Sequence, residues 1–305
     1  VSAEQVEWEA SPAISGGSVV HVRRASGRSY LAHYPPASRP PQGWPMVMFL
    51  HGGSGNAAQL FGQLQVQQFA NESGFAAVFP HGTGTRLTTE SLLTWNAAPG
   101  KCGYAAKTNA DDVGFILACI EHFSQKIAPL DPKRLFCTGF SNGAMMCCRL
   151  AADPRASLVF AAVAPVNGCH VFDSASFSPS RPIGILYIHS VDDPRALYDG
   201  GLGPPFPMTN KRIMHSKVDD FLAQWIKSNG CSPQARQLDH RTDGSHTATL
   251  YGWFSNTPKA EVLHWKLAGG GHAWPGVAQR KSRAERICGP STNVIDATKE
   301  IWLYF

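Results

Sequence analysis

The sequence predicts an α/β fold in which a mostly parallel central sheet carries helices on both faces. Three observations support this prediction. Short apolar runs alternate with segments of helical periodicity, which is the pattern of βαβ units. The chain has 305 residues, an ordinary length for one large α/β domain, so we expect a single domain over residues 1–305. One strand-to-helix junction is a tight turn between two glycines, Gly139 and Gly143.

The composition excludes several classes of protein. Charged residues make up 16% of the chain and apolar residues 43%, which excludes intrinsic disorder, a coiled coil and a collagen-like fibre. The net charge of +5 is mild for this length, so we expect no nucleic-acid partner. No stretch approaches about 18 uninterrupted apolar residues, so we expect no membrane-spanning helix and no membrane partner.

The first part of the chain predicts a hairpin that leads into alternating strands and helices. Residues 19–24 and 29–34 alternate apolar and polar side chains on either side of Ser26-Gly27. Apolar runs that end in glycine are typical of buried parallel strands. Together with one helical pattern they predict strands over 46–53 and 75–82 and a helix over 56–73.

The next helix is predicted to begin at Asn109, which is a suitable N-cap residue. The irregular segment before it, residues 83–108, is long for a compact domain, and such loops are usually functional. The apolar residues after Asn109 recur at helical spacing on one face. By the same two patterns the rest of the chain predicts strands over 134–141, 159–168, 183–190 and 262–269, and helices over 142–152, 218–226 and 292–305.

The strongest chemical signal is the sequence Gly139-Phe140-Ser141-Asn142-Gly143. It lies between a predicted strand and a predicted helix, which is the context that a G-x-S-x-G nucleophile turn requires. The two glycines let strand and helix approach closely, so the Ser141 hydroxyl is lifted above the sheet. We therefore expect Ser141 to be a nucleophile.

A serine hydroxyl needs a base, and the base needs an orienting acid. His272 is the candidate base, because it follows a predicted strand within a glycine-rich loop, Gly269 to Gly276. The acid is expected after the strand over 183–190, where either Asp192 or Asp193 is suitable. The resulting chain order is serine, aspartate, histidine.

A third element, His51-Gly52-Gly53, ends the first central strand. Small residues there leave backbone N–H groups free to face a developing oxyanion. We expect the N–H of Gly53 and the N–H of Asn142 to form this oxyanion hole. A phosphate-binding loop is the alternative, but no Gly-Lys-Ser/Thr sequence follows.

These motifs resemble those of the α/β-hydrolase family that includes extracellular polyhydroxybutyrate depolymerases, feruloyl esterases and acetylxylan esterases. The similar segments lie in order along most of the chain, and they are residues 50–57, 109–116, 139–146, 164–168, 188–201 and 269–276. The acid segment of that family reads His-Gly-Thr-x-Asp and is followed by Tyr-x-Gly-Gly. The resemblance therefore implies Asp193 as the acid, with Tyr198 after it, although Ser190-Val191 replace the usual Gly-Thr.

The resemblance implies a serine carboxylic-ester hydrolase with an α/β-hydrolase fold and no metal or organic cofactor. Its expected substrates are small-molecule or oligomeric esters with short-chain, hydroxyacyl or hydroxycinnamoyl groups. A serine peptidase or lactonase on the same fold is an alternative, and so is a catalytically silent binding protein. Trp95, Tyr198 and Trp274 are the candidate substrate-binding residues, since aromatic rings stack on flat acyl or sugar rings. For the two tryptophans, packing beneath the loops is the alternative.

Eight cysteines occur at wide spacings, without a Cys-x-x-Cys pair. Four of them lie in predicted loops: Cys102, Cys169, Cys231 and Cys288. We expect disulfides among these four and therefore a secreted or periplasmic location, where such bonds persist. The pairing and the oligomeric state do not follow from the sequence.

Overall fold

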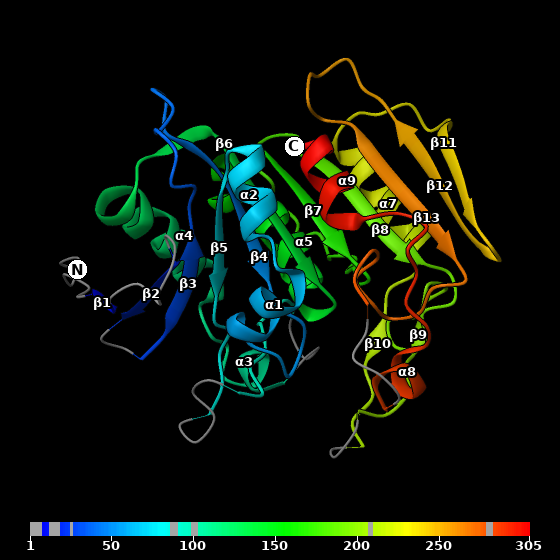
Figure 1. The fold of residues 1–305 in the computed structure, drawn as a ribbon. Helices are drawn as coiled ribbons and strands as arrows, with labels where there is room; N and C mark the ends of the chain where they lie inside the picture. The colour runs from blue at the N-terminus through cyan, green and yellow to red at the C-terminus, as the bar shows by residue number, and fades with distance from the viewer. Residues whose placement is uncertain are drawn as a thin grey trace.

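A computed structural model describes residues 8–11, 19–24, 27–85, 91–98, 103–206, 210–278 and 283–305. Within these residues the centre is one twisted, eleven-stranded sheet (Figure 1). Its strands, in spatial order, are β1 (Trp8–Ser11), β2 (Val19–Arg24), β3 (Ser29–His33), β5 (Ala76–Pro80), β4 (Trp44–Leu50), β6 (Leu130–Phe140), β7 (Ala162–Val166), β8 (Gly184–Ser190), β13 (Val262–Ala268), β12 (His246–Trp253) and β11 (Arg236–Asp243).

The middle of this sheet is parallel, from β5 through β4, β6, β7 and β8 to β13. Because parallel strands end at the same edge, the loops after β4, β6, β8 and β13 meet there. The strands at both sides of the sheet are antiparallel to their neighbours. The predicted α/β architecture is confirmed, with antiparallel strands added at each side.

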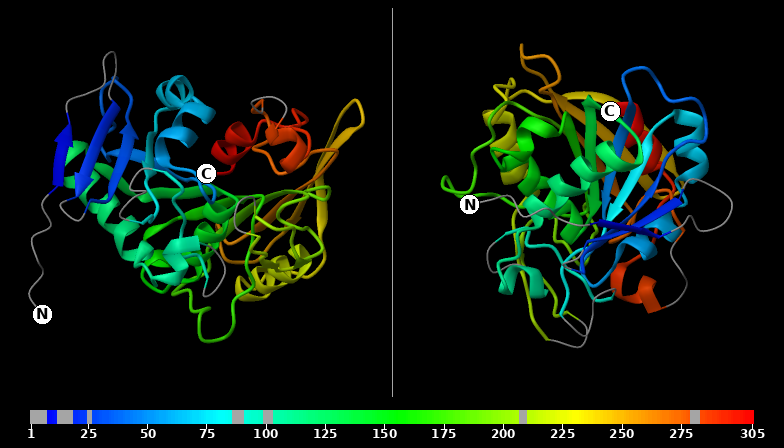
Figure 2. Two further views of the ribbon diagram at one scale, coloured as in Figure 1. Left: turned by 90° about the horizontal axis from the view of Figure 1, so that it is seen from below. Right: turned by 90° about the vertical axis from the view of Figure 1, so that its left-hand side faces the viewer.

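Helices cover both faces of the sheet, as predicted (Figure 2). One face packs against α1 (Ala57–Leu64), α2 (Gln67–Ser73) and α9 (Ala297–Tyr304), and the other against α4 (Asp112–His122), α5 (Asn142–Ala152) and α7 (Val218–Ser228). Two apolar clusters, one on each face, form the core. The remaining short elements are α3 (Gly103–Lys107), η1 (Phe123–Ile127), α6 (Ala156–Val159), α8 (Arg283–Cys288), and a separate β9–β10 hairpin (Gly201–Leu202 and Met214–His215).

The β11–β12 hairpin is not among the predicted elements. Every described side chain of β11 is exposed or half-buried, so the strand lacks the apolar alternation that marks a half-buried strand. The turn did leave a signal, since Asp243-Gly244 is a typical hairpin dipeptide and Gly244 has a φ of +60°.

Three predicted helix boundaries are wrong. The helix expected over 292–305 begins only at Ala297, after its N-cap residue Asp296. The segment 56–73 holds two helices, because Gln65 adopts a left-handed φ of +48° that ends α1. Helix α4 begins after Asp111, whose carboxylate caps the N–H of Gly114, whereas Asn109 has a φ of +49° outside the helix. Asp112 at the first helical position is buried against Arg28, with 2.7 Å between the carboxylate and guanidinium.

The cysteines do not pair as a set of loop disulfides. No disulfide joins any two of the seven cysteines within the described residues, which include Cys169, Cys231 and Cys288. Cys102 lies outside the described residues. Of the helices that the structure describes, none has the length and apolar character needed to cross a membrane.

Candidate active site

Ser141 occupies the sharp turn between β6 and α5. Its φ of +56° and ψ of −115° are unfavourable for a residue with a Cβ, and such strain persists only where the surroundings hold it. The Ser141 N–H donates to the Val166 carbonyl of β7 at 2.9 Å. A Cβ on Gly143 would lie 2.2 Å from the Leu50 carbonyl oxygen, and one on Gly168 would lie 2.4 Å from the Ser141 carbonyl oxygen. Only glycine therefore fits at these two positions.

His272 reaches Ser141 from the loop that follows β13. The Ser141 hydroxyl lies 2.9 Å from the Nε2 atom of His272, and the Nδ1–H of His272 donates to Asp193 Oδ2 at 2.7 Å. The loop is held by its backbone, since the N–H groups of Gly271 and His272 donate to the carbonyls of Pro290 and Cys288. The fold thus brings together three side chains that are up to 131 residues apart in the chain.

Asp193 and Asp192 differ sharply in their surroundings. Asp193 is 3% exposed, and its Oδ1 accepts the N–H groups of Arg195 and Ala196 at 2.7 and 2.8 Å. Burial alone would raise the pKa of Asp193, but the charge of His272 and hydrogen bonds from His189 and His272 hold it well below its usual value. Asp192 is exposed and accepts only the N–H of Gly269 within the described residues. Of the two aspartates, only Asp193 contacts His272.

The loop after β4 lies beside Ser141. A Cβ on Gly53 would be 3.5 Å from the Asn142 Cβ, and one on Gly52 would be 3.5 Å from the Ser141 Cβ. Within the described residues, neither the Gly53 N–H nor the Asn142 N–H donates to a protein acceptor. Two predicted oxyanion donors therefore stand next to the nucleophile and are available to a ligand.

His51 fixes this loop, a role that the sequence analysis missed. Its Nδ1–H donates to the Gly52 carbonyl at 2.8 Å, and its Nε2 accepts the Gly82 N–H at 2.9 Å. In a trans peptide the carbonyl and the following N–H point in opposite directions, so holding the Gly52 carbonyl aims the Gly53 N–H away from His51. Burial lowers the pKa of His51 to about 3, which keeps the ring neutral. The signal was present, because His51 opens the His-Gly-Gly motif.

The structure corrects the three predicted substrate-binding residues. The rings of Trp95, Tyr198 and Trp274 are buried, at 0%, 7% and 1% exposed, so they offer no face to a substrate. Trp95 instead supports the site from beneath: its Nε1–H donates to the His51 carbonyl, and its backbone pairs with the Asn142 side chain. Tyr198 donates to His264, and Trp274 donates to Thr298 on α9. The sequence correctly placed these three residues in loops, but it did not show that their rings point into the protein.

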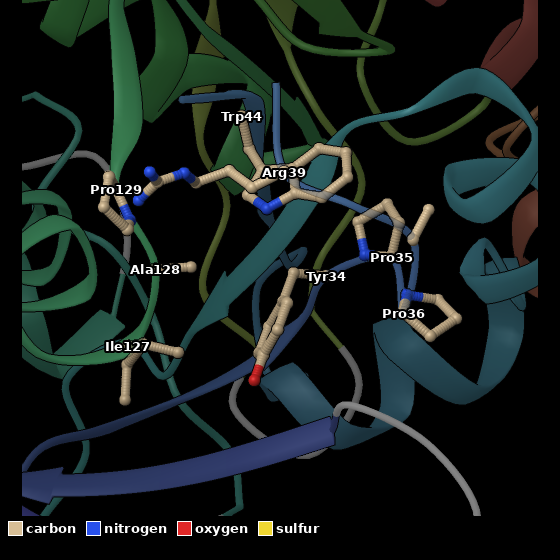
Figure 3. A pocket seen from close by; sticks show the side chains of 9 residues that line it. Tyr34, Pro35, Pro36, Arg39, Trp44, Ile127, Ala128 and Pro129 are labelled. Carbon is tan, nitrogen blue, oxygen red and sulfur yellow. The ribbon is translucent and has the colours of Figure 1, made fainter. Parts of the chain in front are cut away.

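A cavity of about 630 Å³ is lined by residues outside this site, and Figure 3 shows the side chains that line it. Its walls include Tyr34, Arg39, Trp44 and Pro129, at the start of β4. Strand β4 has seven residues from Trp44 to Leu50, and at about 3.3 Å per step the cavity is roughly 20 Å from the strand ends that carry the site. Among the described residues no cluster of three or more His, Cys, Asp or Glu side chains is arranged to hold a metal ion.

Comparisons with known proteins identify the family. The family model described as "Esterase PHB depolymerase" matches residues 28–247, most of the chain. The chain belongs to this family. A relative from Nocardia uniformis subsp. tsuyamanensis is 27% identical, and the match covers 82% of this chain and 71% of the relative. Feruloyl esterase B of Piromyces equi is 28% identical over 81% of this chain, which spans only 42% of that longer protein.

A solved structure shows the same fold as this esterase-family chain. The acetyl xylan esterase from Aspergillus awamori superimposes with a TM-score of 0.56, at 14% identity, over 98% of this chain and 100% of its own. Similarity at this identity supports the α/β-hydrolase fold and no finer property.

Proposed function

We propose that this chain is a serine carboxylic-ester hydrolase that acts through an acyl-enzyme on Ser141. The observation that carries the proposal is the continuous hydrogen-bonded line from the Ser141 hydroxyl through His272 to Asp193, with contacts of 2.9 and 2.7 Å. A buried carboxylate at Nδ1 fixes the imidazole tautomer that leaves Nε2 ready to accept a proton. Residues 1–305 are proposed to form one catalytic domain.

The proposed reaction has two stages. His272 Nε2 takes the Ser141 proton as the Ser141 oxygen attacks the ester carbonyl, and the negative oxygen that forms accepts the N–H groups of Gly53 and Asn142. The protonated His272 then gives its proton to the leaving alcohol as the ester C–O bond breaks. In the second stage His272 takes a proton from water, the resulting hydroxide attacks the acyl-enzyme, and Ser141 recovers its proton as the acid leaves.

The proposed substrates are short-chain, hydroxyacyl or hydroxycinnamoyl esters, small or oligomeric. Family membership supports this, as do the names of the relatives, one a feruloyl esterase and another an acetyl xylan esterase. Short elements at the carboxyl edge of the sheet, α3, α8 and the β9–β10 hairpin, surround the site (Figure 1). They and the neighbouring loops expose apolar groups, including Leu92 at 49% and Tyr104 at 38%. A panel of p-nitrophenyl esters, methyl ferulate and hydroxybutyrate oligomers, measured beside a peptide and a lactone, separates ester hydrolysis from peptidase and lactonase activity.

Replacement of Ser141 tests the proposal directly. We expect Ser141→Ala to abolish ester hydrolysis and labelling by a fluorophosphonate probe, while the circular dichroism spectrum stays unchanged. The matched control is Ser176→Ala, an exposed serine in the loop after β7, which should react as the wild type does. A Ser141→Ala protein that keeps more than a few per cent of activity would contradict the assignment. A wild type inert to every ester and to the probe would instead favour a silent binding protein.

We also propose an extracytoplasmic location, which rests on the similarity to feruloyl and acetyl xylan esterases and not on disulfides. Since no bridge joins the seven described cysteines to one another, at most one bridge, to Cys102, remains. Eight cysteines minus the two of such a bridge leave at least six thiols in denatured, unreduced protein. A thiol titration in denaturant that finds four or fewer would contradict this count.

A further inference from the structure

A second histidine, besides His272, contacts the carboxylate of Asp193. His189 lies in β8, four residues before Asp193, and is 1% exposed. Its Nε2 atom is 3.3 Å from Asp193 Oδ2 and 2.8 Å from the Ala196 carbonyl oxygen. The same carboxylate oxygen, Oδ2, therefore lies between two imidazole rings.

We propose that His189 is a positioning residue for catalysis, which holds the Asp193 carboxylate in the orientation that aligns His272. The inference rests on the proposed function, because it concerns the acid of the same triad. Tyr187 and His189 are a buried, hydrogen-bonded pair that acts on the triad through Asp193 and does not contact the substrate.

The hydrogen-bond partners of His189 fix its tautomer. A backbone carbonyl and a carboxylate only accept hydrogen bonds, so the Nε2 atom that faces both must carry the proton. The Nδ1 atom then has a lone pair, and the buried hydroxyl of Tyr187 donates to it. Each polar atom of His189 thus has a complementary partner.

These contacts leave the carboxylate little freedom. Oδ1 accepts the backbone N–H groups of Arg195 and Ala196. Oδ2 accepts the Nδ1–H of His272 at 2.7 Å and lies 3.3 Å from the Nε2–H of His189, which is shared with the Ala196 carbonyl. His189 also binds the Ala196 carbonyl, so it ties the end of β8 to the turn that supplies those N–H groups. Without the Nε2–H of His189, Asp193 Oδ2 would accept a hydrogen bond only from His272, and the carboxylate could rotate together with the His272 ring.

The neighbouring His264 offers a matched comparison. It is buried like His189, its ring stacks on Tyr187 at 5.4 Å, and it is hydrogen-bonded to the Tyr187 carbonyl and the Tyr198 hydroxyl. Within the described residues, neither of these two hydrogen bonds of His264 reaches Asp193. The titratable and charged groups around the Asp193–His189 pair are Tyr187, His264, Tyr198, Cys169, His272, Arg195 and Cys288.

The test compares His189→Leu, His189→Gln and His264→Gln by kcat and KM for p-nitrophenyl acetate across pH. We expect His189→Leu to lower kcat by about 10- to 100-fold with KM changed less than about twofold, since outer partners of a reacting group have effects of this size. It should also move the acid limb of kcat/KM to higher pH, because a carboxylate with one donor fewer attracts the imidazolium proton more strongly. His189→Gln, which keeps an N–H near Nε2, should recover most of kcat, and His264→Gln should leave the acid limb in place.

A wild-type kcat and acid limb in folded His189→Leu would overturn the proposal, and so would an equal shift of the limb in His264→Gln. If His189→Leu does not fold, Tyr187→Phe replaces it, because it removes the hydroxyl that is hydrogen-bonded to His189 Nδ1. An unchanged kcat and an unchanged acid limb in Tyr187→Phe overturn the proposal. Side-chain ¹⁵N NMR of the wild type supplies a readout that does not depend on activity. A proton on Nε2 of His189 supports the inference, and a proton on Nδ1 overturns it. A wild type that reacts neither with esters nor with fluorophosphonate overturns the proposed function alone.

Discussion

Two adjacent aspartates with the same chemistry have different surroundings in this molecule. Asp193 is buried and bonded to His272, whereas Asp192 is exposed and caps the N–H of Gly269. We expect Asp193→Asn to lower kcat by about 10⁴, because an amide favours the wrong imidazole tautomer. Asp192→Asn should change kcat less than about threefold, since the amide oxygen still accepts the Gly269 N–H. Steady-state kinetics of the two variants measures this, and the reverse ranking would contradict the assignment of Asp193.

For single residues, the position of a side chain could be predicted from the sequence where a backbone motif determines it. Ser141 and His272 follow strands of one parallel sheet, so the motif and its position already placed them at one edge. The predicted orientation was wrong for Trp95 and Trp274, whose rings turn inward and donate to the His51 carbonyl and to Thr298. The rotamer of a loop tryptophan depends on contacts from distant segments, and no local pattern encodes those contacts.

At the scale of elements, the junction of β6 and α5 depends on glycine. We expect Gly143→Ala to lose activity and at least about 2 kcal/mol of unfolding free energy, because its Cβ would lie 2.2 Å from the Leu50 carbonyl oxygen. Gly62→Ala is the matched control on α1, where a Cβ meets nothing within 4 Å. It should keep full activity and gain about 0.5–1 kcal/mol from helix propensity. Urea unfolding measures both, and a Gly143→Ala protein as stable as the wild type would contradict the packing argument.

The elements that the sequence predicted best are those buried on both sides. β4, β5 and β7 are continuous apolar runs, β8 is one as far as Ile188, and all of their residues are buried. Boundaries set by tertiary contacts were missed, such as the start of α4, where Asp112 pairs with the distant Arg28. β11 was not predicted because its side chains are exposed or half-buried, and a strand that packs little against the core shows no apolar pattern in its sequence.

At the scale of the whole molecule, the two ends of the parallel strands have different roles. The carboxyl ends of β4, β6, β8 and β13 carry the loops with Gly53, Ser141, Asp193 and His272. The opposite ends carry the cavity between Trp44 and Pro129, which contains no part of the triad. A fold of this kind lets the catalytic loops vary in sequence while the sheet keeps their starting points fixed.

Two buried neutral histidines should make the stability of the whole molecule depend on pH. Burial lowers the pKa of His51 and of His264 to about 3, against about 6.5 in the unfolded chain. Between these values the unfolded chain binds two protons that the folded chain does not, so stability falls as the pH drops from about 6.5 towards 3. Carboxylates with a lowered pKa, such as Asp193, add their effect only below about pH 4.

Between pH 7 and pH 5 each of these histidines should account for about 2 kcal/mol of lost unfolding free energy. Urea unfolding at the two pH values measures the loss in the wild type and in His264→Gln, where about half of it should disappear. The control is His240→Gln on the exposed face of β11, which should show the full wild-type loss. A wild type equally stable at pH 7 and pH 5 would mean that His51 and His264 take up protons in the folded protein. That result would contradict the neutral state of His51 from which we argued that its ring orients the Gly52 carbonyl.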